Sequence, residues 1–390
     1  MLHATSATID LGALRHNMNT IRALVGDRSL LVAVKANAYG HGAVPISLFL
    51  EANQLADWLG VATTPEALEL RDAGVTLPIL KMSATLPAEL PALMAHPDVA
   101  LCVTDETSID DAEAAAAAVG RTCDVHLVVD TGMGRFGGPP DTALRLARRV
   151  ATCAHLNLQG LATHPPTSDA TDDDGFTNTE LADFQALVAA IQDDRANAGL
   201  APVPLIHSAN SGVVLGHDMT GVTMVRPGIL AYGYFPDADT PWPVPLRSVL
   251  SLTSQISFIK QVPAGQTIGY GRTWQAPVDT WIATVPVGYA DGYSRLNSNQ
   301  GTMLVGGRAC PVAGRVCMDF TMLDLGPSPQ RPASVGDRVT WLGRDGDAVI
   351  TADDLAAIMG TISYEVLCLA GSRVPRHYVN DDGEPSEAIV

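Results

Sequence analysis

The feature that most constrains the fold is an alternation that runs from residue 29 to about residue 228. Short apolar runs, typical of buried strands, are separated by segments with helical periodicity. There are eight such runs, at residues 29–35, 58–62, 78–82, 99–103, 125–130, 158–164, 205–210 and 223–226. Eight strands that alternate with helices predict an α/β protein with a (β/α)8 TIM barrel. A doubly wound open sheet would give the same periodicity, so the pattern alone leaves that alternative open.

The clearest helix signal follows Thr64, which we interpret as an N-cap. Pro65 then takes the first helical position, Glu66 lies in the first turn and Gly74 ends the helix. Similar patterns predict helices over 141–150 and 179–197.

The positions of the polar residues favour the barrel over the open sheet. Six of them stand at or just after the carboxyl ends of predicted strands: Lys35, Arg135, His164, Asn210, Ser211 and Arg226. In a barrel these ends converge on one mouth, where active sites are built.

A proline-rich stretch, 236–245, predicts a linker, and the pattern changes after it. Alternating or β-branched runs indicate a mainly antiparallel β domain, at 250–262, 281–287, 302–305, 309–312 and 337–342. A capping box of Thr351 and Asp354 starts a helix that we expect to reach about Ile362. A short strand at residues 7–9 is expected to pair with this domain. The predicted division is a barrel over 11–240 and a β domain over 241–390 that includes residues 1–10.

Composition excludes several classes of partner. The chain of 390 residues has a net charge of −18, which argues against nucleic acid and anionic membranes. The six cysteines form no C-x-x-C motif, which suits a reducing compartment and argues against a structural metal. We see no signal peptide and no apolar stretch as long as a membrane span, so we expect a cytoplasmic protein.

Residues 33–42, A-V-K-A-N-A-Y-G-H-G, contain one of only three lysines in the chain, Lys35. This lysine ends a buried apolar run, and burial lowers a lysine's pKa. A neutral amine can condense with a carbonyl cofactor. A lone strand-end lysine that reaches solvent would be the commoner case, so the surrounding motif decides.

The whole decapeptide resembles the pyridoxal-phosphate lysine motif of the alanine racemase family. Members of this family are fold-type III pyridoxal-phosphate enzymes. The resemblance implies that Lys35 carries pyridoxal 5'-phosphate and that Tyr39 contacts its phosphate. It spans Lys35 to Arg376 through six separated motifs in the family's order.

Two motifs would surround the cofactor ring. In D-T-G-M-G-R-F-G, residues 130–137, glycines allow close approach to a ligand and Arg135 offers a fork for an oxygen anion. The family places this arginine by the ring oxygen and the substrate carboxylate. In T-H-P-P, residues 163–166, the resemblance implies that His164 stacks on the ring. The segment after His164 departs from the family's phenylalanine-containing sequence.

Two further motifs, H-S-A-N-S-G at 207–212 and V-R-P-G-I at 225–229, suit a phosphate and a pyridine nitrogen. Ser211 and the backbone N–H groups of Gly228 and Ile229 can cradle a dianion, with Asn210 beside them. Arg226 can donate a hydrogen bond to the ring nitrogen but cannot protonate it, which leaves the ring a weaker electron sink. This favours a racemase over decarboxylases of the same fold, which have an acid there.

Racemisation needs acid–base groups on both faces of a planar carbanion, and an amine with a phenol can supply them. In I-G-Y-G-R-T-W, residues 268–274, the resemblance makes Tyr270 the second base and directs it at the site of a neighbouring subunit, in a homodimer with shared active sites. The remaining motifs place Tyr289, Cys317 and Asp319 at the entrance, Met318 at the substrate and Tyr364 at the cofactor and the small substrate side chain.

One position departs clearly from the family. Many members have a carbamylated lysine whose negative charge holds the arginine of D-T-G-M-G-R, and this chain has Val128 there. A buried guanidinium with unmet donors is costly, so we expect chloride or another side chain to pair with Arg135.

The interpretation is an alanine racemase that interconverts L- and D-alanine and supplies D-alanine for peptidoglycan. The alternatives are a racemase of serine or basic amino acids, a non-catalytic pyridoxal-phosphate carrier and a decarboxylase. Non-catalytic carriers resemble the first domain only, so the Tyr270 motif argues against that alternative.

Overall fold

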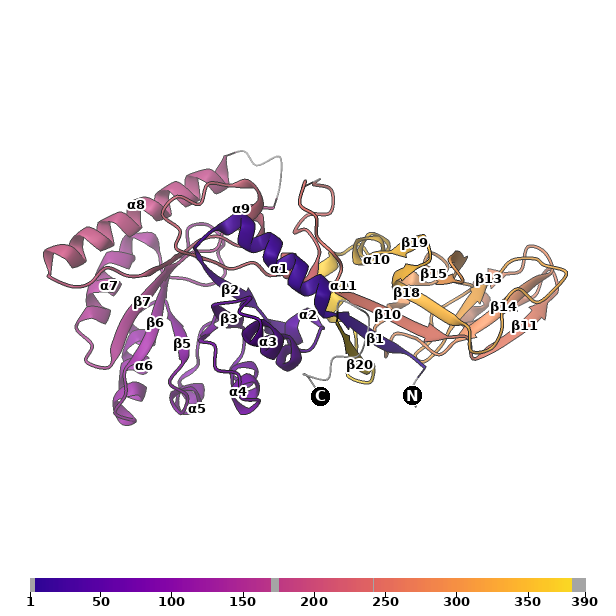
Figure 1. Ribbon diagram of the computed structural model, residues 1–390, viewed down its shortest axis with the longest axis horizontal. Helices are drawn as coiled ribbons and strands as arrows, with labels where there is room; N and C mark the ends of the chain where they lie inside the picture. Colours follow the sequence, from indigo (N-terminus) through magenta and orange to yellow (C-terminus); the bar gives the residue numbers. More distant parts are fainter. Residues whose placement is uncertain (1–3, 170–174, 241, 381–390) are drawn as a thin grey trace. The chain divides into compact units, whose positions relative to one another are not determined.

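A computed structural model describes residues 4–169, 175–240 and 242–380 (Figure 1). The chain divides into two compact units. We call 15–38 and 42–247 the barrel unit, and the described parts of 1–14, 39–41 and 248–390 the β unit. The three residues 39–41, which follow the Lys35 segment, therefore belong to the β unit.

All eight predicted strands of the barrel unit form, and they lie parallel in the order β8-β7-β6-β5-β4-β3-β2-β9. A bridge between Ala209 and Val225, with a hydrogen bond of 2.7 Å from Arg226 N–H to Ala209 O, links β8 to β9. The two ends of the sheet therefore meet, which confirms the barrel over the open sheet. The strands are β2 (Ser29–Ala33), β3 (Trp58–Val61), β4 (Ile79–Lys81), β5 (Val99–Val103), β6 (Cys123–Val128), β7 (Leu156–Ala162), β8 (Leu205–His207) and β9 (Met224–Val225).

Helices cover the outside of these strands (Figure 1). They are α1 (Leu11–Val25), which begins in the β unit, α3 (Ala43–Ala52), α4 (Thr64–Asp72), α5 (Leu90–Met94), α6 (Glu106–Ala118), α7 (Ala143–Ala151), α8 (Phe176–Asn197) and α9 (Ser211–Gly216), with 3-10 turns η1 (Pro87–Glu89), η2 (Pro140–Thr142) and η3 (Ile229–Tyr232).

The N-cap of α4 corrects the sequence prediction by one residue. Thr63, not Thr64, is the cap: its side chain accepts from Glu66 N–H at 3.4 Å, and the Glu66 carboxylate accepts from Thr63 N–H at 3.0 Å. This reciprocal capping box satisfies two N–H groups that the first turn of a helix leaves without partners.

The interior of the barrel is a packed apolar core. Side chains from six different strands meet there, including Leu31, Leu80, Ala100, Val128 and Ala162. Val128 is only 7% exposed, so the valine that stands at the family's lysine position is part of this core. Its burial stabilises the barrel by the hydrophobic effect, about 25 cal/mol for each Å² of apolar surface removed from water.

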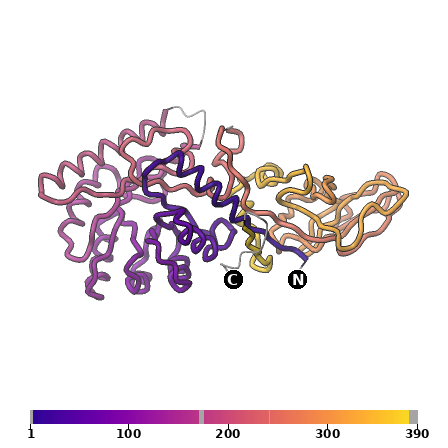
Figure 2. Tube along the Cα trace, in the orientation of Figure 1, coloured from indigo at the N-terminus to yellow at the C-terminus, as the bar shows by residue number. Residues whose placement is uncertain are grey.

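The β unit is mainly antiparallel, as the sequence predicted. Its largest sheet has the order β16-β15-β18-β10-β1-β20 with β19 on β18, and smaller sheets join β11-β14-β17 and β12-β13. The strand expected near residues 7–9 is β1, which pairs antiparallel with β10 and parallel with β20, so the indigo end of the chain lies beside an orange strand (Figure 2). The strands are β1 (Ser6–Asp10), β10 (Leu250–Gln255), β11 (Phe258–Val262), β12 (Thr267–Ile268), β13 (Trp274–Gln275), β14 (Thr280–Val285), β15 (Thr302–Val305), β16 (Arg308–Pro311), β17 (Thr321–Asp324), β18 (Arg338–Asp345), β19 (Ala348–Ile350) and β20 (Arg376–Val379).

Two predicted elements of the β unit differ from the structure. The run at 250–262 is two strands, because Ile256 N–H bonds to Asp337 O whereas Ser257 N–H bonds to Thr284 O, so the chain changes sheets between them. The helix that begins at the Thr351 capping box is α10 (Ala352–Met359), and it ends before Ile362 because Gly360 is left-handed with φ 68°. A second helix, α11 (Ser363–Cys368), follows. Within the described residues no helix has both the length and the apolar character needed to cross a bilayer.

Candidate active site

Lys35 directly follows the short linker from β2 and opens a rare left-handed turn, α2 (Lys35–Tyr39). Residues 36–39 have φ between 52° and 54°, and none of them is glycine. The turn is closed by a hydrogen bond of 2.8 Å from Ala38 N–H to Val34 O. Left-handed conformations cost about 1–2 kcal/mol for each residue with a side chain, so the surroundings must hold this turn in place. Strain of this kind concentrates at functional sites, and here it lies directly after Lys35.

Arg226, which follows β9, is held inside the mouth by three hydrogen bonds. Its Nη1 donates to His207 Nδ1 at 2.8 Å and to His207 O, and its Nη2 donates to Thr163 O at 2.7 Å. A guanidinium has five N–H groups. Among the described residues, one N–H on Nη2 and the N–H on Nε have no acceptor, so they can bind a ligand.

A chain of imidazoles continues behind Arg226. His207 Nε2 lies 2.8 Å from His126 Nδ1, and His126 Nε2 lies 3.3 Å from Gln159 Oε1. Because arginine only donates, His207 must accept at Nδ1 and carry its proton on Nε2, and His126 must then donate from Nε2 to Gln159. Both rings are therefore neutral.

The pKa values agree with this assignment of protons. Burial lowers the pKa of His126 to about 4, although the hydrogen bond that His126 donates to Gln159 opposes this shift. Burial together with Arg226 holds the pKa of His207 well below its usual range. Burial also lowers the pKa of Arg226 to about 10, with Arg135 adding to the shift and Cys102 opposing it. Arg226 thus remains a cation at neutral pH.

His164 lies near three cations of the mouth. Burial, and then the charges of Arg226, Arg135 and Lys35 in that order, lower its pKa to about 3. The imidazole is therefore neutral at neutral pH. Residues 170–174 of the segment after His164, which departs from the family sequence, lie outside the described residues.

Arg135 differs from the expectation of a buried guanidinium. Its side chain is exposed, and no other described residue forms a hydrogen bond or ion pair with it. The predicted cost of burying this charge without a partner therefore does not arise, and no side chain of the described residues takes the place of a carbamate. Its loop is shaped by Asp130, whose Oδ1 accepts from Gly132 N–H and Gly134 N–H at 3.0 Å each.

The segments that carry Ser211 and Gly228 are joined at the mouth. Gly228 N–H donates to Ser211 Oγ at 3.1 Å. Asn210 caps α9 by accepting from Val213 N–H at 3.1 Å, and Ser168 Oγ donates to the same Asn210 oxygen at 2.9 Å. The structure therefore brings together Lys35, Arg135, His164, Asn210, Ser211, Arg226, Gly228 and Ile229 in the barrel unit.

In the β unit, Tyr39 packs against Tyr364 with ring centroids 6.0 Å apart. Burial raises the pKa of Tyr39 beyond its usual range, and the nearby Cys368 adds to this, so the phenol keeps its proton. The sequence predicted both tyrosines as cofactor contacts, and that role remains a prediction.

Tyr270 is 71% exposed on a turn between Gly269 and Gly271, which have φ 74° and 71°. Tyr289 and Met318 are also exposed, and backbone hydrogen bonds join their loops, with Tyr289 N–H donating to Cys317 O at 3.1 Å. Tyr270, Tyr289 and Met318 are therefore exposed side chains of the β unit.

Asp319 is fixed at the end of the Cys317–Met318 loop. Arg373 bonds both to it, at 2.8 Å, and to the buried Asp291, at 2.7 Å. Hydrogen bonds to the two carboxylates raise the pKa of Arg373 above its usual range. The loop predicted to line the entrance is thus held by an ion-pair bridge.

Sequence reasoning missed His126, Gln159 and the role of His207. A signal was present, because His126 stands two residues before Val128 and period-2 alternation places both on the inward face of β6. A polar residue at an inward barrel position needs a partner.

A parallel barrel with a lysine, two arginines and a neutral histidine at its mouth is typical of a barrel enzyme whose site lies at the carboxyl ends of the strands. A family model described as the N-terminal domain of alanine racemase matches residues 9–236, and one described as its C-terminal domain matches 249–378. The chain belongs to the alanine racemase family, and it is an amino-acid racemase.

Individual relatives agree. Alanine racemase of Cutibacterium acnes is 44% identical over 373 residues, which are 96% of this chain and 97% of the relative. The structure of alanine racemase from Clostridium difficile 630 matches with a TM-score of 0.90 at 32% identity and covers 99% of this chain and 98% of that one. Histidine racemase from Leuconostoc mesenteroides matches with a TM-score of 0.86 at 28% identity, covering 97% and 98%.

The residues at the mouth fit the cofactor that the resemblance implies, pyridoxal phosphate. An amine matches its carbonyl. The Ser211 hydroxyl, which already accepts from Gly228 N–H, can still donate to its phosphate together with the Ile229 N–H, and the two N–H groups of Arg226 without acceptors suit its ring nitrogen. In a chain of net charge −18, this cluster of cations is the local environment that a dianion needs.

Proposed function

We propose that this racemase acts on alanine, uses pyridoxal phosphate carried by Lys35, and works as a homodimer in which Tyr270 of one subunit completes the site of the other. The observation that carries the proposal is Arg226. Three of its N–H groups are used by protein acceptors, and two are left for the ring nitrogen. An arginine that cannot release its proton suits a proton transfer at Cα better than a decarboxylation.

In this proposal, Lys35 Nζ and Tyr270 Oη stand on opposite faces of the substrate Cα. One removes the Cα proton and the other delivers a proton to the opposite face, which inverts the configuration, and the two exchange roles in the reverse direction. When bound, pyridoxal phosphate supplies a ring that accepts the negative charge left at Cα. Arg135 binds the substrate carboxylate, and neutral His164 packs on the ring without adding charge.

Subunit complementation tests the shared site. Lys35→Ala and Tyr270→Phe should each be inactive, whereas mixed and reassembled subunits should recover about a quarter to a half of the sites, because one site of each heterodimer is intact. Absence of recovery in isolated heterodimers would show that both groups come from one chain. The exposure of Tyr270, 71%, supports the proposal.

Substrate choice is the second question, since a histidine racemase shares the fold at 28% identity. Alanine should be the best substrate, because Tyr364 and Met318 would leave room for only a small side chain. Comparing kcat/KM for alanine, serine, lysine, arginine and histidine decides the matter. Restored growth of a bacterium that requires D-alanine would support a role in supplying peptidoglycan.

A further inference from the structure

The left-handed turn after Lys35 has an external brace in the barrel unit. The Ala36 N–H, from the residue directly after Lys35, donates to Glu66 Oε1 at 2.7 Å. Glu66 lies thirty positions further along the chain, in the first turn of α4. The contact therefore joins the end of one barrel strand to the helix that follows the next.

The other oxygen of the same carboxylate serves a second strand end. Glu66 Oε2 accepts from Ala62 N–H at 2.8 Å and from Thr63 N–H at 3.0 Å, directly after β3. One carboxylate thus accepts three backbone N–H groups and ties the carboxyl ends of β2 and β3 together. Hydrogen bonds to a charged acceptor are stronger than neutral ones, which suits a brace on a strained turn.

We propose that Glu66 is a positioning residue for Lys35: it holds the Ala36 peptide in the left-handed conformation and thereby fixes where the lysine side chain starts. Capping the helix requires only Oε2, whereas Oε1 is used for the Lys35 segment. The turn at 36–39 has φ of 52–54° without any glycine, so it needs such a restraint. The inference rests on the proposed role of Lys35.

Glu66→Gln separates the two tasks. A carboxamide has one oxygen, which two N–H groups on the capping side compete for, and its NH2 then faces the Ala36 N–H as a second donor. We expect kcat to fall about tenfold or more with little change in KM for alanine, because a small displacement of a reacting group costs up to about a hundredfold. Titration of the visible absorption of the lysine-bound cofactor against pH should also shift, as should the Kd of the apoprotein for pyridoxal phosphate.

Thr63→Ala is the matched control. It removes the hydroxyl of the capping box but leaves the Ala36 contact intact. It should lower the melting temperature of the apoprotein by about 2–4 °C, as a lost N-cap does, without changing kcat, the pH titration or the cofactor Kd.

The proposal would be overturned if Glu66→Gln kept the wild-type kcat and the wild-type pH titration of the cofactor absorption. It would also be overturned if Thr63→Ala changed both as much as Glu66→Gln does. If Glu66→Gln does not fold, Glu66→Asp decides: its charge is retained but it is one methylene too short to reach both strand ends, so wild-type values there also overturn the proposal. Failure of the proposed function would look different, since the wild-type protein itself would then lack a reducible cofactor linkage at Lys35.

Discussion

Two of the three segments that bring cations to the barrel mouth, those of Lys35 and Arg135, are held in different ways. The turn after Lys35 has four consecutive left-handed residues and a carboxylate brace from Glu66. It continues into Gly40, where an added Cβ would lie 2.2 Å from Leu367 O within the β unit. The loop that carries Arg135 is packed less evenly. A Cβ at Gly132 would lie 2.2 Å from Glu180 Oε1 and Phe136 packs against the barrel core, whereas a Cβ at Gly134 would have nothing within 4 Å.

The difference matches the tasks proposed for the two cations. A lysine that forms a covalent bond and transfers a proton must start from a fixed position, because proton transfer depends steeply on geometry. An arginine that binds the carboxylate of an incoming substrate forms no covalent bond and transfers no proton, so its position can be less strictly fixed. Backbone strain is therefore greater in the turn after Lys35, whose four left-handed residues all carry side chains, than in the Arg135 loop, whose left-handed positions are Gly134 and Gly137.

The largest effect should come from removing the anchor. Lys35→Ala should lower D-alanine formation by about a thousandfold or more, because it removes both a general base and the cofactor linkage. Lys260→Ala, at an exposed position on β11, is the matched control and should be fully active. Borohydride reduction followed by mass spectrometry should find the cofactor on Lys35. A reducible linkage that persists in Lys35→Ala would contradict the assignment.

Replacing one glycine in each segment by alanine compares how strongly the two segments are constrained. Gly40→Ala should destabilise the protein by about 3 kcal/mol, because it combines a left-handed φ of 83° with a backbone clash. Gly134→Ala, at φ 66° in open space, should cost only about 1–2 kcal/mol. Thermal unfolding monitored by circular dichroism measures both. Equal losses would mean that the two segments are equally constrained.

Replacing Arg135 tests whether its loop binds the substrate carboxylate. Arg135→Ala should reduce kcat/KM for alanine by about a hundredfold, the value of a charge-assisted contact to a carboxylate. Val128 can take up no carbon dioxide, so activity should not change when bicarbonate is removed, and a bound anion such as chloride should appear near Arg135 in crystals. Unchanged kinetics in Arg135→Ala, with the side chain directed to solvent, would refute its role.

Much of the barrel could be predicted from sequence because its signals are local. The eight apolar runs matched strands to within a few residues, since each run is buried as a unit. The split of 250–262 between two sheets could not be predicted, because it depends on partners at Asp337 and Thr284 that are distant in sequence. The candidate site residues at the strand ends could be predicted for the same reason, because each lies in a short sequence motif.

The support around those residues could not be predicted. The hydrogen bond from Ala36 to Glu66 joins residues that are far apart in sequence, and so does the chain of imidazoles behind Arg226. No short sequence motif predicts either contact. The exposure of Arg135 also contradicted the expectation of a buried charge, which had assumed that the site is closed around it.

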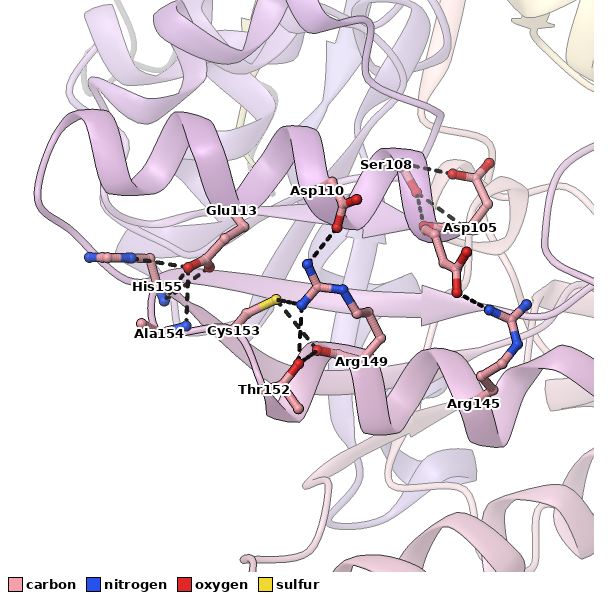
Figure 3. Close-up of polar contacts among 11 residues, drawn as sticks. Asp105, Ser108, Asp110, Glu113, Arg145, Arg149, Thr152, Cys153, Ala154 and His155 are labelled. Carbon is pink, nitrogen blue, oxygen red and sulfur yellow. Dashed lines mark hydrogen bonds and ion pairs between the residues drawn. The ribbon is translucent and has the colours of Figure 1, made fainter.

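The smallest effect on stability is expected from a substitution near the amino-terminal end of β7. Between α6 and α7, Arg145 pairs with Glu106, and Arg149 pairs with Asp110 at 2.6 Å. Figure 3 shows the Arg149 pair beside Glu113 of α6, which bonds at 3.1 Å to Nδ1 of His155, the residue directly before β7. Glu113 also accepts from the N–H groups of Ala154 and His155, just before β7. Glu113 therefore holds the amino-terminal end of β7, as Glu66 holds the turn at the carboxyl end of β2.

Burial alone would raise the pKa of Glu113, but the bonds from His155 and the two N–H groups hold it below its usual range. A depressed carboxyl pKa stabilises the fold above the unfolded value, about 4.3, and this contribution disappears as the pH falls through the folded value. Glu113→Ala should therefore cost about 1–2 kcal/mol at pH 7, and the loss should shrink below about pH 4. Asp111→Ala is the control, because this carboxylate on the same helix bonds to no described residue. Unlike Glu66→Gln, Glu113→Ala should leave kcat unchanged, so a fall in kcat would show that the brace at the base of the barrel also positions the site.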